Sequence, residues 1–214
     1  MDIIILLGAP GSGKGTAAER IAPRLNLRPV SSGALLRAAA AAGTAAGLEA
    51  KSYMESGTLV PDALVGRVIC EQLAAGGAET RWLLDGFPRT VVQAQMLEDA
   101  AKAAGGRVLK AFLLEVPEDV IVKRLAGRRV CPACNATYHI EGLPPKTEGV
   151  CDHCGTGLVI RPDDNEATVR NRLSVYATST APLADWYEER GLLVRIDGMG
   201  GAAKVADRLV AALS

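Results

Sequence analysis

Residues 3–16 read IIILLGAPGSGKGT, an apolar run that ends in a glycine-rich turn. The run from Ile3 to Leu7 predicts a short buried strand, and the turn predicts the start of a helix. Such a junction aims several backbone N–H groups and a helix N-terminus at one point, which suits a polyphosphate. Gly8, Gly13 and Lys14 keep the GxxxxGK spacing of a P-loop, in which the lysine reaches the outer phosphates.

One detail departs from the general P-loop pattern. Gly15 follows Lys14, and the hydroxyl comes one position later, at Thr16. A glycine-rich turn alone is also compatible with a simple connection between a strand and a helix. The strand, the full spacing, the lysine and the hydroxyl together favour phosphate binding. The residues predicted to cradle the phosphates are Gly11, Ser12, Gly13, Lys14, Gly15 and Thr16.

The composition predicts one globular unit that has no general affinity for polyanions. The chain has 214 residues, of which 49% are hydrophobic, so it can bury one substantial core with small lobes appended. Lys plus Arg equals Asp plus Glu at 24 each, which argues against nucleic acid and anionic membranes as partners. The sequence shows no leader and no membrane-spanning run, so we expect a cytoplasmic protein with reduced cysteines.

Strands and helices are expected to alternate along the chain. Apolar runs predict five strands, over 3–7, 28–30, 82–84, 108–116 and 192–196. Helical signals cover 14–25, 33–42, 44–56, 62–75, 90–104, 117–126, 164–190 and 204–213. This alternation predicts an α/β fold with a parallel sheet that helices cover on both faces and ligands at the carboxyl ends of the strands.

Some positions carry local structural signals. In the alanine-rich stretch 38–46, Gly43 is expected to end one helix and Thr44 to cap the next. Asp163 and Glu166 form a D-x-x-E pattern that predicts the N-terminus of the helix after the Cys-rich segment. Cys70 is interpreted as a small core residue on a helix.

Residues 130–160 interrupt the alternation and are rich in Cys, Gly and Pro. They contain two CxxC pairs, Cys131 with Cys134 and Cys151 with Cys154, with 16 residues between the pairs. This spacing is typical of structural zinc sites, in which four thiolates leave no coordination position open for chemistry. A segment of about 30 residues cannot build its own core, so the metal would hold it together. Free thiols are the alternative. The residues interpreted as surface histidines are His139 and His153.

Several motifs in a fixed order make the chain similar to bacterial adenylate kinases of the long-lid, zinc-binding kind. The resemblance covers essentially the whole sequence and includes the glycine that follows Lys14. The other matching stretches are Ser32-Gly33 with Leu36-Arg37, Gly57-Thr58-Leu59-Val60, Asp85-Gly86-Phe87-Pro88-Arg89, Gln93, 124–129, Arg161-Pro162-Asp163-Asp164 and Val169-Arg170-Asn171-Arg172-Leu173.

The resemblance implies a P-loop nucleoside monophosphate kinase fold with a five-stranded parallel sheet. It implies the reaction ATP + AMP ⇌ 2 ADP, with Mg²⁺ on ATP and a structural Zn²⁺. Three mobile parts follow from it: a core (1–30, 61–126 and 165–214), an AMP-binding lobe over 31–60 and a zinc-binding lid over 127–164. The expected partners of the monomer are ATP, AMP and ADP, without nucleic acid or membrane.

The resemblance also assigns nucleotide contacts. On the ATP side it adds Arg124, whose guanidinium plane would stack on adenine, and the backbone near Gly200 to the phosphate cradle. It suggests a cis bond between Phe87 and Pro88. Gln93 would read the edge of the AMP base, although an exposed helical residue is its alternative. The residues implied for AMP are Ser32, Gly33, Arg37, Thr58, Leu59, Val60, Gly86, Arg89 and Gln93.

The arginines match what phosphoryl transfer needs, because its loose transition state is stabilised by positioned positive charge. Arg124 and Arg128 stand four residues apart and are expected on one face of a helix that leads into the lid. Lid closure is expected to bring Arg161 and Arg172 to the same phosphate. Surface charges are expected at Arg129, Arg170 and Arg190. The predicted catalytic set is Lys14, Asp85, Arg89, Arg124, Arg128, Arg161 and Arg172.

No general base is apparent, since both histidines lie in the insert. A phosphate acceptor is already ionised near pH 7, whereas a hydroxyl acceptor needs a base, so the acceptor is expected to be a nucleotide phosphate. Asp85 is expected to hold Mg²⁺ through water next to the cradle, with a turn cap as its alternative. Two rival functions are a kinase that prefers UMP or CMP, and a zinc-ribbon ATPase that binds nucleic acid, which the balanced charge disfavours.

One position departs from the family pattern. Two residues after Ser32, where the family usually carries an acidic side chain, this chain has Ala34. The missing carboxylate is expected to weaken the water network around Mg²⁺.

Overall fold

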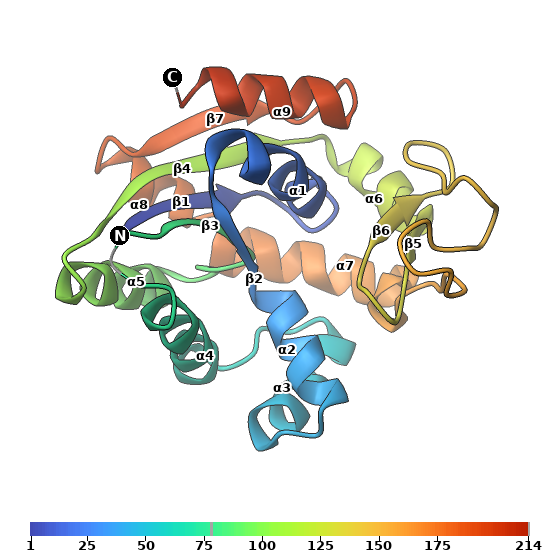
Figure 1. Cartoon of the computed structure of the whole chain (residues 1–214), viewed down its shortest axis with the longest axis horizontal. Helices are drawn as coiled ribbons and strands as arrows, with labels where there is room; N and C mark the ends of the chain where they lie inside the picture. The colour runs from blue at the N-terminus through green and yellow to red at the C-terminus, as the bar shows by residue number, and fades with distance from the viewer. Residues whose placement is uncertain (78, 214) are drawn as a thin grey trace.

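The computed structural model of the chain describes residues 1–77 and 79–213. Its centre is a five-stranded parallel sheet in the order β2-β3-β1-β4-β7 (Figure 1). The strands are β1 (Asp2–Leu7), β2 (Arg28–Ser31), β3 (Arg81–Asp85), β4 (Arg107–Glu115) and β7 (Leu193–Asp197). The predicted α/β fold is confirmed, and each strand begins and ends within one residue of its predicted bounds.

β1 shows why helices cover both faces of the sheet. Successive side chains of a strand point to opposite faces, and Ile3 and Ile5 pack into one core while Ile4 and Leu6 pack into the other. The first core is closed by α4 (Asp62–Ala74), α5 (Val91–Ala103) and α8 (Leu183–Glu188). The second is closed by α1 (Lys14–Leu25) and α9 (Ala202–Ala211), which contact each other.

The helices α2 (Ser32–Ala41) and α3 (Ala45–Ser56) follow β2 and project from the sheet (Figure 1). The predicted break between them is confirmed. Gly43 has a φ of 69°, and Thr44 caps α3 by accepting a hydrogen bond from the N–H of Gly47 at 3.1 Å. Gly47 is buried, and a Cβ there would overlap the backbone of Ala39, so α2 and α3 pack closely.

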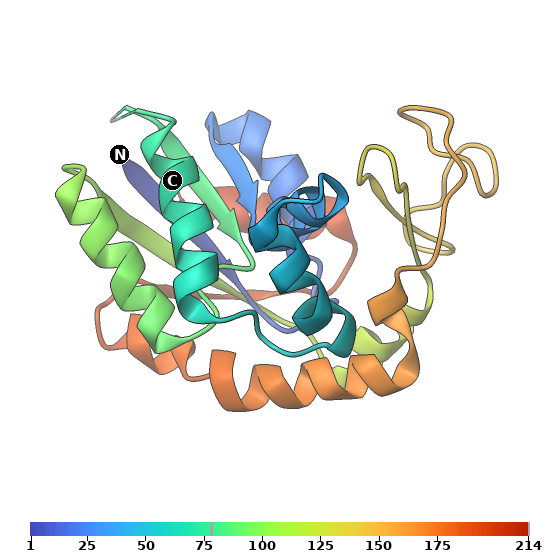
Figure 2. The ribbon, with the colours of Figure 1, turned by 90° about the horizontal axis from the view of Figure 1, so that it is seen from below.

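The Cys-rich insert lies between α6 (Glu118–Ala126) and the helix that follows it, at one end of the molecule (Figure 2). Two short antiparallel strands, β5 (Arg128–Val130) and β6 (Thr137–His139), form its sheet. Its buried cluster consists of Cys131, Tyr138 and Cys151, with two partly buried neighbours. So small an apolar cluster agrees with a segment that depends on a metal ion.

The predicted continuous helix over 164–190 is wrong. The chain instead forms a 3₁₀ turn at Pro162–Asp164, α7 (Glu166–Val175), a π-helical turn at Tyr176–Thr180 and then α8. Pro182 lacks an N–H and separates the π-helical turn from α8, so regular α-helical bonding cannot run through. The other predicted helices agree with the structure within two residues at each end.

The predicted cap of this segment is also wrong. Asn165 caps α7, because its side-chain oxygen accepts a hydrogen bond from the N–H of Thr168 at 3.0 Å. Glu166 pairs with Arg170 at 2.7 Å on the exposed face. None of the helices in the described residues has the length and apolarity needed to cross a bilayer.

Candidate active site

The phosphate cradle lies at the carboxyl end of β1, where the chain turns into α1. Gly8, Gly11 and Gly13 adopt φ values of 139°, 85° and 98°, a region that disfavours residues with a Cβ. A Cβ on Gly8 would also lie 2.8 Å from the carbonyl oxygen of Leu114 on β4. The glycines are therefore required both for the turn and for its packing against the sheet.

Lys14 occupies the first position of α1 and folds back over the cradle. Its Nζ donates hydrogen bonds to the carbonyl oxygens of Gly8 at 2.8 Å and Ala9 at 2.9 Å. Desolvation in the loop lowers the pKa of Lys14 to about 8, although the Asp85 carboxylate opposes this shift. A bound phosphate would supply a direct negative counter-charge for the ammonium group of Lys14.

Asp85 ends β3 and pairs in register with Leu6 of β1, so its carboxylate lies beside the cradle. Its Oδ2 is 3.5 Å from the position that a Cβ on Gly15 would occupy. Within residues 1–77 and 79–213, no hydrogen bond engages this carboxylate, so nothing there supports the turn-cap alternative. A free carboxylate beside a phosphate cradle is the oxygen ligand that suits Mg²⁺.

A second hollow lies next to the cradle, between the ends of β2 and β3 and the helices α2 and α3. All nine residues that the sequence assigns to AMP line this hollow, together with Met54, Asp163 and Arg172. The structure thus brings together residues from four sequence motifs, of which the first and last, Ser32 and Gln93, lie 61 positions apart. The assigned residues are Ser32, Gly33, Arg37, Thr58, Leu59, Val60, Gly86, Arg89 and Gln93.

Gln93 is 1% exposed, so its interpretation as an exposed helical residue is wrong. Its Oε1 accepts a hydrogen bond from the N–H of Arg89 at 2.8 Å, and its Nε2 donates to Asp62 at 2.8 Å. One amide N–H and one oxygen lone pair remain for a ligand. Gln93 therefore positions Arg89 and still presents polar atoms to the hollow.

Arg89 follows a cis peptide bond between Phe87 and Pro88, as predicted. Its Nε donates to the carbonyl oxygen of Gly86 at 2.8 Å. Among the described residues, neither terminal guanidinium nitrogen of Arg89 makes a hydrogen bond. This fixed stem with free ends suits bidentate binding of a phosphate.

Arg128 and Arg172 are held by two aspartates at the end of the insert. Asp164, whose side chain has no exposed surface, accepts hydrogen bonds from Arg128 Nε at 2.7 Å and from Arg128 Nη2. Arg172 Nη1 donates to Asp163 Oδ2 at 2.8 Å and to Asp164 Oδ1 at 3.3 Å. The two guanidinium groups are therefore ordered without a nucleotide.

Arg161 and Arg37 complete a group of five arginines with Arg89, Arg128 and Arg172. Enclosure by the protein, with repulsion from Arg128 and Arg37, lowers the pKa of Arg161. Enclosure also lowers the pKa of Arg37. Among the described residues, neither the guanidinium group of Arg161 nor that of Arg37 makes a hydrogen bond. The five positive charges exceed the three nearby aspartates, Asp85, Asp163 and Asp164, and favour a polyanion.

The prediction that Arg124 and Arg128 share one helix face is wrong. α6 ends at Ala126, and Arg128 begins β5. A Cβ on Gly127 would overlap the ring of His139, which packs where the chain leaves the helix. Arg124 accordingly faces the cradle, whereas Arg128 faces Asp164.

Arg124 joins the cradle to the loop that follows β7. Its Nη1 donates to the carbonyl oxygen of Ser12 at 3.1 Å, and its Nη2 donates to that of Gly198 at 3.0 Å. These bonds leave the flat face of the guanidinium available for stacking. In the same loop, no described residue donates to the carbonyl of Gly200, so this acceptor is available to a ligand.

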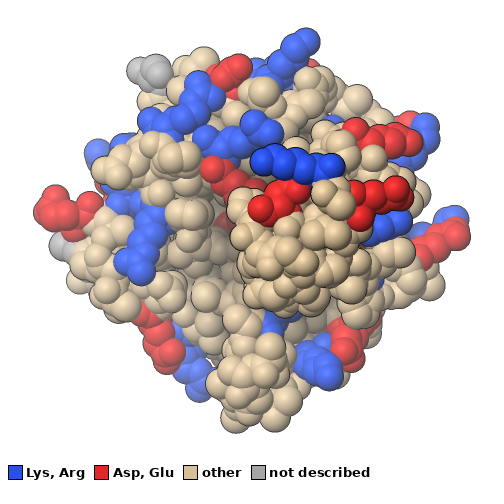
Figure 3. Space-filling view, turned by 45° about the vertical axis from the view of Figure 1, so that its right-hand side comes forward, with Lys and Arg blue, Asp and Glu red and all other residues tan. Residues whose placement is uncertain are grey.

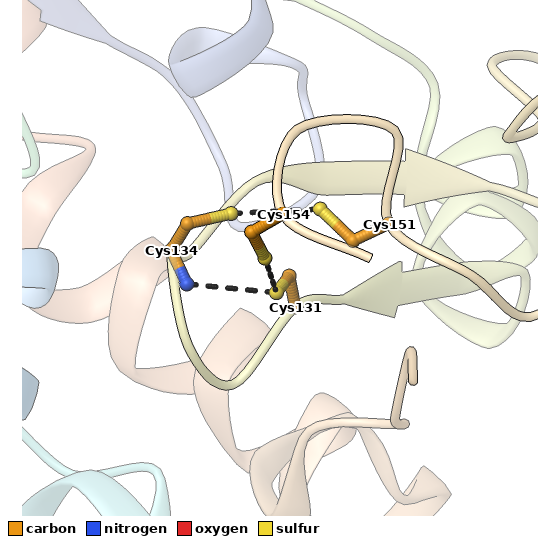
Figure 4. Close-up of side chains that lie close together, drawn as sticks. All are labelled: Cys131, Cys134, Cys151 and Cys154. Atoms are coloured by element: carbon orange, nitrogen blue, oxygen red, sulfur yellow. Dashed lines mark hydrogen bonds between the residues drawn. The ribbon is translucent and has the colours of Figure 1, made fainter. Parts of the chain in front are cut away.

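The four insert cysteines point toward one another from two separate loops (Figure 4). Their sulfur atoms all lie within 4.8 Å of one another, with 3.3 Å between Cys131 and Cys154 and 3.5 Å between Cys134 and Cys151. Tetrahedral zinc with bonds of about 2.3 Å requires sulfur separations of about 3.8 Å. The donor set therefore fits Zn²⁺. Cys70 is partly buried on α4, away from this group.

His139 differs from the predicted surface histidine. Its Nδ1 accepts hydrogen bonds from the N–H groups of Glu141 at 3.1 Å and Gly142 at 3.0 Å. Its ring packs on Gly127, so it shapes the start of the insert. His153 is exposed, as expected. Of the predicted surface arginines, Arg170 and Arg190 are exposed and Arg129 is partly buried.

Two residues of the site, Asp62 and Thr180, were not predicted from the sequence. Asp62 accepts hydrogen bonds from Gln93 and Thr90, and Thr180 donates to the backbone carbonyl of Arg89. Asp62 looks in the sequence like an ordinary acidic residue at a helix start, and Thr180 lies inside a segment predicted as uniform helix. Only Pro182 signalled an irregularity there.

Basic and acidic side chains are interspersed on the face drawn in Figure 3. That face therefore shows no extended basic track for a nucleic acid.

Comparison with known proteins agrees with the geometry. A family model described as adenylate kinase matches residues 6–192. The chain is 46% identical over 210 residues to the adenylate kinase of Syntrophobacter fumaroxidans, which covers 98% of this chain and 99% of that protein. It is 47% identical over 195 residues to the adenylate kinase of Bacillus licheniformis, covering 91% of this chain and 90% of the other. A third relative, the adenylate kinase of Lachnospira eligens, is 46% identical over 195 residues, with 91% and 92% covered.

Proposed function

The chain belongs to the adenylate kinase family and catalyses ATP + AMP ⇌ 2 ADP, and we propose which of its residues perform each part of this reaction. The cradle from Gly11 to Thr16 holds the phosphates of ATP, with Lys14 on the outer ones. The face of Arg124 stacks on adenine, and the carbonyl of Gly200 accepts from its amino group. The support is the free acceptor and the free guanidinium face described above.

AMP occupies the second hollow. Arg37 and Arg89 bind its phosphate, because both guanidinium groups have free nitrogens that face the hollow. Thr58, Leu59 and Val60 form the wall against which the base packs. Gln93 reads the base edge with its remaining N–H and lone pair. Ser32, Gly33 and Gly86 line the floor between the two nucleotides.

Mg²⁺ fits the oxygen donors beside the cradle. Asp85 would hold it through water, and the hydroxyl of Thr16 is a second oxygen donor from the cradle. When bound, the ion neutralises charge on the phosphates of ATP. The chain's own task is to hold the two nucleotides in line and to keep the site closed to water.

Arginine side chains stabilise the transferring group. Arg128, Arg161 and Arg172 surround the space between the two nucleotides, and their positive charge is worth most when water is excluded. No residue needs to remove a proton, because the phosphate of AMP is ionised near neutral pH. Positioning and charge stabilisation therefore account for the catalysis.

We infer a three-part organisation in which residues 127–164 close over ATP and residues 31–60 close over AMP, while 1–30, 61–126 and 165–214 form the core. Zn²⁺ on Cys131, Cys134, Cys151 and Cys154 keeps the moving lid folded. We expect a monomer that works in the cytoplasm, where thiols stay reduced for metal binding.

One observation carries this proposal, namely that all nine predicted AMP residues line one hollow beside the cradle. An acceptor panel tests it: ATP and Mg²⁺ are supplied with AMP, UMP, CMP or a single-stranded oligonucleotide. AMP should be phosphorylated far faster than UMP or CMP, and the oligonucleotide should neither bind nor stimulate ATP hydrolysis. Equal rates with UMP or CMP would contradict the assignment of the hollow.

A further inference from the structure

Thr180, to which the function proposed above gives no role, holds the backbone of a phosphate-binding arginine. Thr180 ends the π-helical turn Tyr176–Thr180 and is 9% exposed. Its Oγ1 donates a hydrogen bond to the carbonyl oxygen of Arg89 at 2.9 Å, across 91 positions of the sequence. The bond therefore joins two parts of the fold that no local structure connects.

The N–H of Arg89 is held as firmly as its carbonyl. It donates to the buried Oε1 of Gln93, and the amide of Gln93 is fixed by Asp62. Two buried side chains from different segments thus fix both polar groups of the Arg89 backbone. Since the Nε of Arg89 is bound to Gly86, the remaining freedom lies in the terminal nitrogens that face the hollow.

The π-helical turn orients the side chain of Thr180 toward the carbonyl of Arg89. The N–H of Ala181 bonds to the carbonyl of Tyr176 at 2.8 Å, five residues back, so the turn contains one residue more than an α-helical turn. One extra residue rotates the following side chains by about 100° around the helix axis. Thr178 in the same turn stays exposed and bonds only to the carbonyls of its own helix, at Ser174 and Val175.

The same helical segment carries Arg172, eight residues before Thr180. Arg172 and Arg89 line the same hollow, and the positive charge of Arg172 contributes, after enclosure by the protein, to a lowered pKa of Arg89. The hydrogen bond from Thr180 therefore ties the backbone of Arg89 to the segment that carries Arg172.

We propose that Thr180 is a positioning residue that fixes the separation of Arg89 and Arg172, so that Arg89 meets the acceptor phosphate next to the transferring group that Arg172 stabilises. The hydroxyl contacts no substrate and acts through the carbonyl of Arg89. This inference rests on the AMP-side role proposed for Arg89. It predicts a loss that is specific to the acceptor nucleotide, whereas a purely structural hydrogen bond would lower thermal stability alone.

The test compares Thr180→Val, which keeps the shape and removes the hydroxyl, with Thr180→Ser, which restores the donor. Thr178→Val is the matched control, because it removes a hydroxyl from the same π-helical turn. The KM values for AMP and for ATP, kcat and the unfolding temperature are measured for each. T180V should raise the KM for AMP about tenfold, as expected for one lost hydrogen bond to a positioned group, and change the KM for ATP less than about twofold. T180S and T178V should stay within about twofold of the parent for both substrates.

A T180V enzyme with an unchanged KM for AMP overturns the inference, even if it unfolds at a lower temperature. Thr180→Ala serves as a second hydroxyl-free variant should T180V fail to fold, and it must show the same AMP-specific loss. Arg89→Lys separates this result from the proposed function. If R89K leaves AMP binding intact, the role of Arg89 fails. If R89K weakens AMP binding while T180V and T180A do not, only the role of Thr180 fails.

Discussion

Asp164 binds Arg128 through both carboxylate oxygens, at the point where the Cys-rich insert returns to the core. The side chain of Asp164 is fully buried and also accepts from Arg172, so one carboxylate orders two of the arginines that we propose to stabilise the transferring group. In the absence of nucleotide this acid supplies the negative charge that the phosphates supply later. The Asp164–Arg128 pair therefore links the stability of the nucleotide-free protein to the ordering of its active-site arginines.

Asp164→Asn should destabilise the nucleotide-free enzyme by about 3–5 kcal/mol, because it leaves two enclosed guanidinium groups without their shared counter-charge. A bound phosphate compensates for part of that charge, so saturating ATP should reduce the difference between variant and parent. Thermal or denaturant unfolding with and without ATP measures both quantities. The exposed pair at Glu166 provides the control, since Glu166→Gln should change stability by less than about 1 kcal/mol. An equal deficit with and without ATP would argue against counter-charge exchange.

Removing zinc should affect the insert more than the chemistry. A chelator should lower the unfolding temperature and increase proteolysis within residues 127–164, because the insert's buried cluster is too small to hold it folded. At a temperature where the insert still folds, kcat should fall only slightly. Cys131→Ser should reproduce the effect, while Cys70→Ser should not. Elemental analysis that finds no stoichiometric zinc in protein purified without chelator would count against the site.

Lys14 predicts a pH dependence of ATP binding. Its pKa in the free enzyme is about 8, below its ordinary 10.5, and bound phosphates favour the charged form. ATP binding should therefore take up a proton between about pH 8 and 10.5, and affinity should fall as pH rises through that window. Without nucleotide, the lowered pKa of Lys14 means that the unfolded chain holds the ammonium proton more tightly than the folded protein does. Between about pH 8 and 10.5 the free energy of unfolding should therefore rise with pH as far as Lys14 contributes to it.

Calorimetry in buffers of different ionisation enthalpy measures the proton uptake that accompanies ATP binding. Lys14→Arg is the control, because arginine keeps its charge throughout this range. The parent should lose ATP affinity between about pH 8 and 10.5 relative to K14R. Identical pH profiles would show that Lys14 is not the titrating group.

Ala34→Asp should tighten the apparent affinity for Mg²⁺. Ala34 lies in the first turn of α2, which contains no acidic residue, and a carboxylate there is also favoured by the helix N-terminus. The Mg²⁺ concentration that gives half-maximal turnover should fall in A34D, while Ala34→Asn should change it less. An unchanged Mg²⁺ dependence would mean that the absent carboxylate has no bearing on the metal.

The sequence predicted features that depend on local patterns. The strand before Gly8 and the cradle after it follow from apolar residues and glycines that are adjacent in the chain. The four cysteines were predictable for the same reason, because the spacing of the two CxxC pairs is enough to identify them as metal ligands. The AMP residues were placed by family motifs, and the hollow they line supports that placement.

Features that depend on contacts between distant segments were predicted wrongly or missed. The spacing of Arg124 and Arg128 suggested one helix face, but α6 ends between them at Ala126, and the ring of His139 packs on Gly127 just beyond that end. The uniform composition of 164–190 concealed the π-helical turn that directs Thr180 to Arg89. Such a turn is stabilised by its tertiary partner, so no periodicity within the segment reveals it.

In the proposed reaction two nucleotides share one site, and the phosphate passes directly between them. The most direct measurement incubates the protein with ADP and Mg²⁺ alone and follows all three nucleotides. ATP and AMP should appear in equal amounts until equilibrium, and Arg89→Lys should slow the formation of both together. ADP that stays unchanged, or AMP and free phosphate that accumulate without ATP, would contradict the proposed reaction.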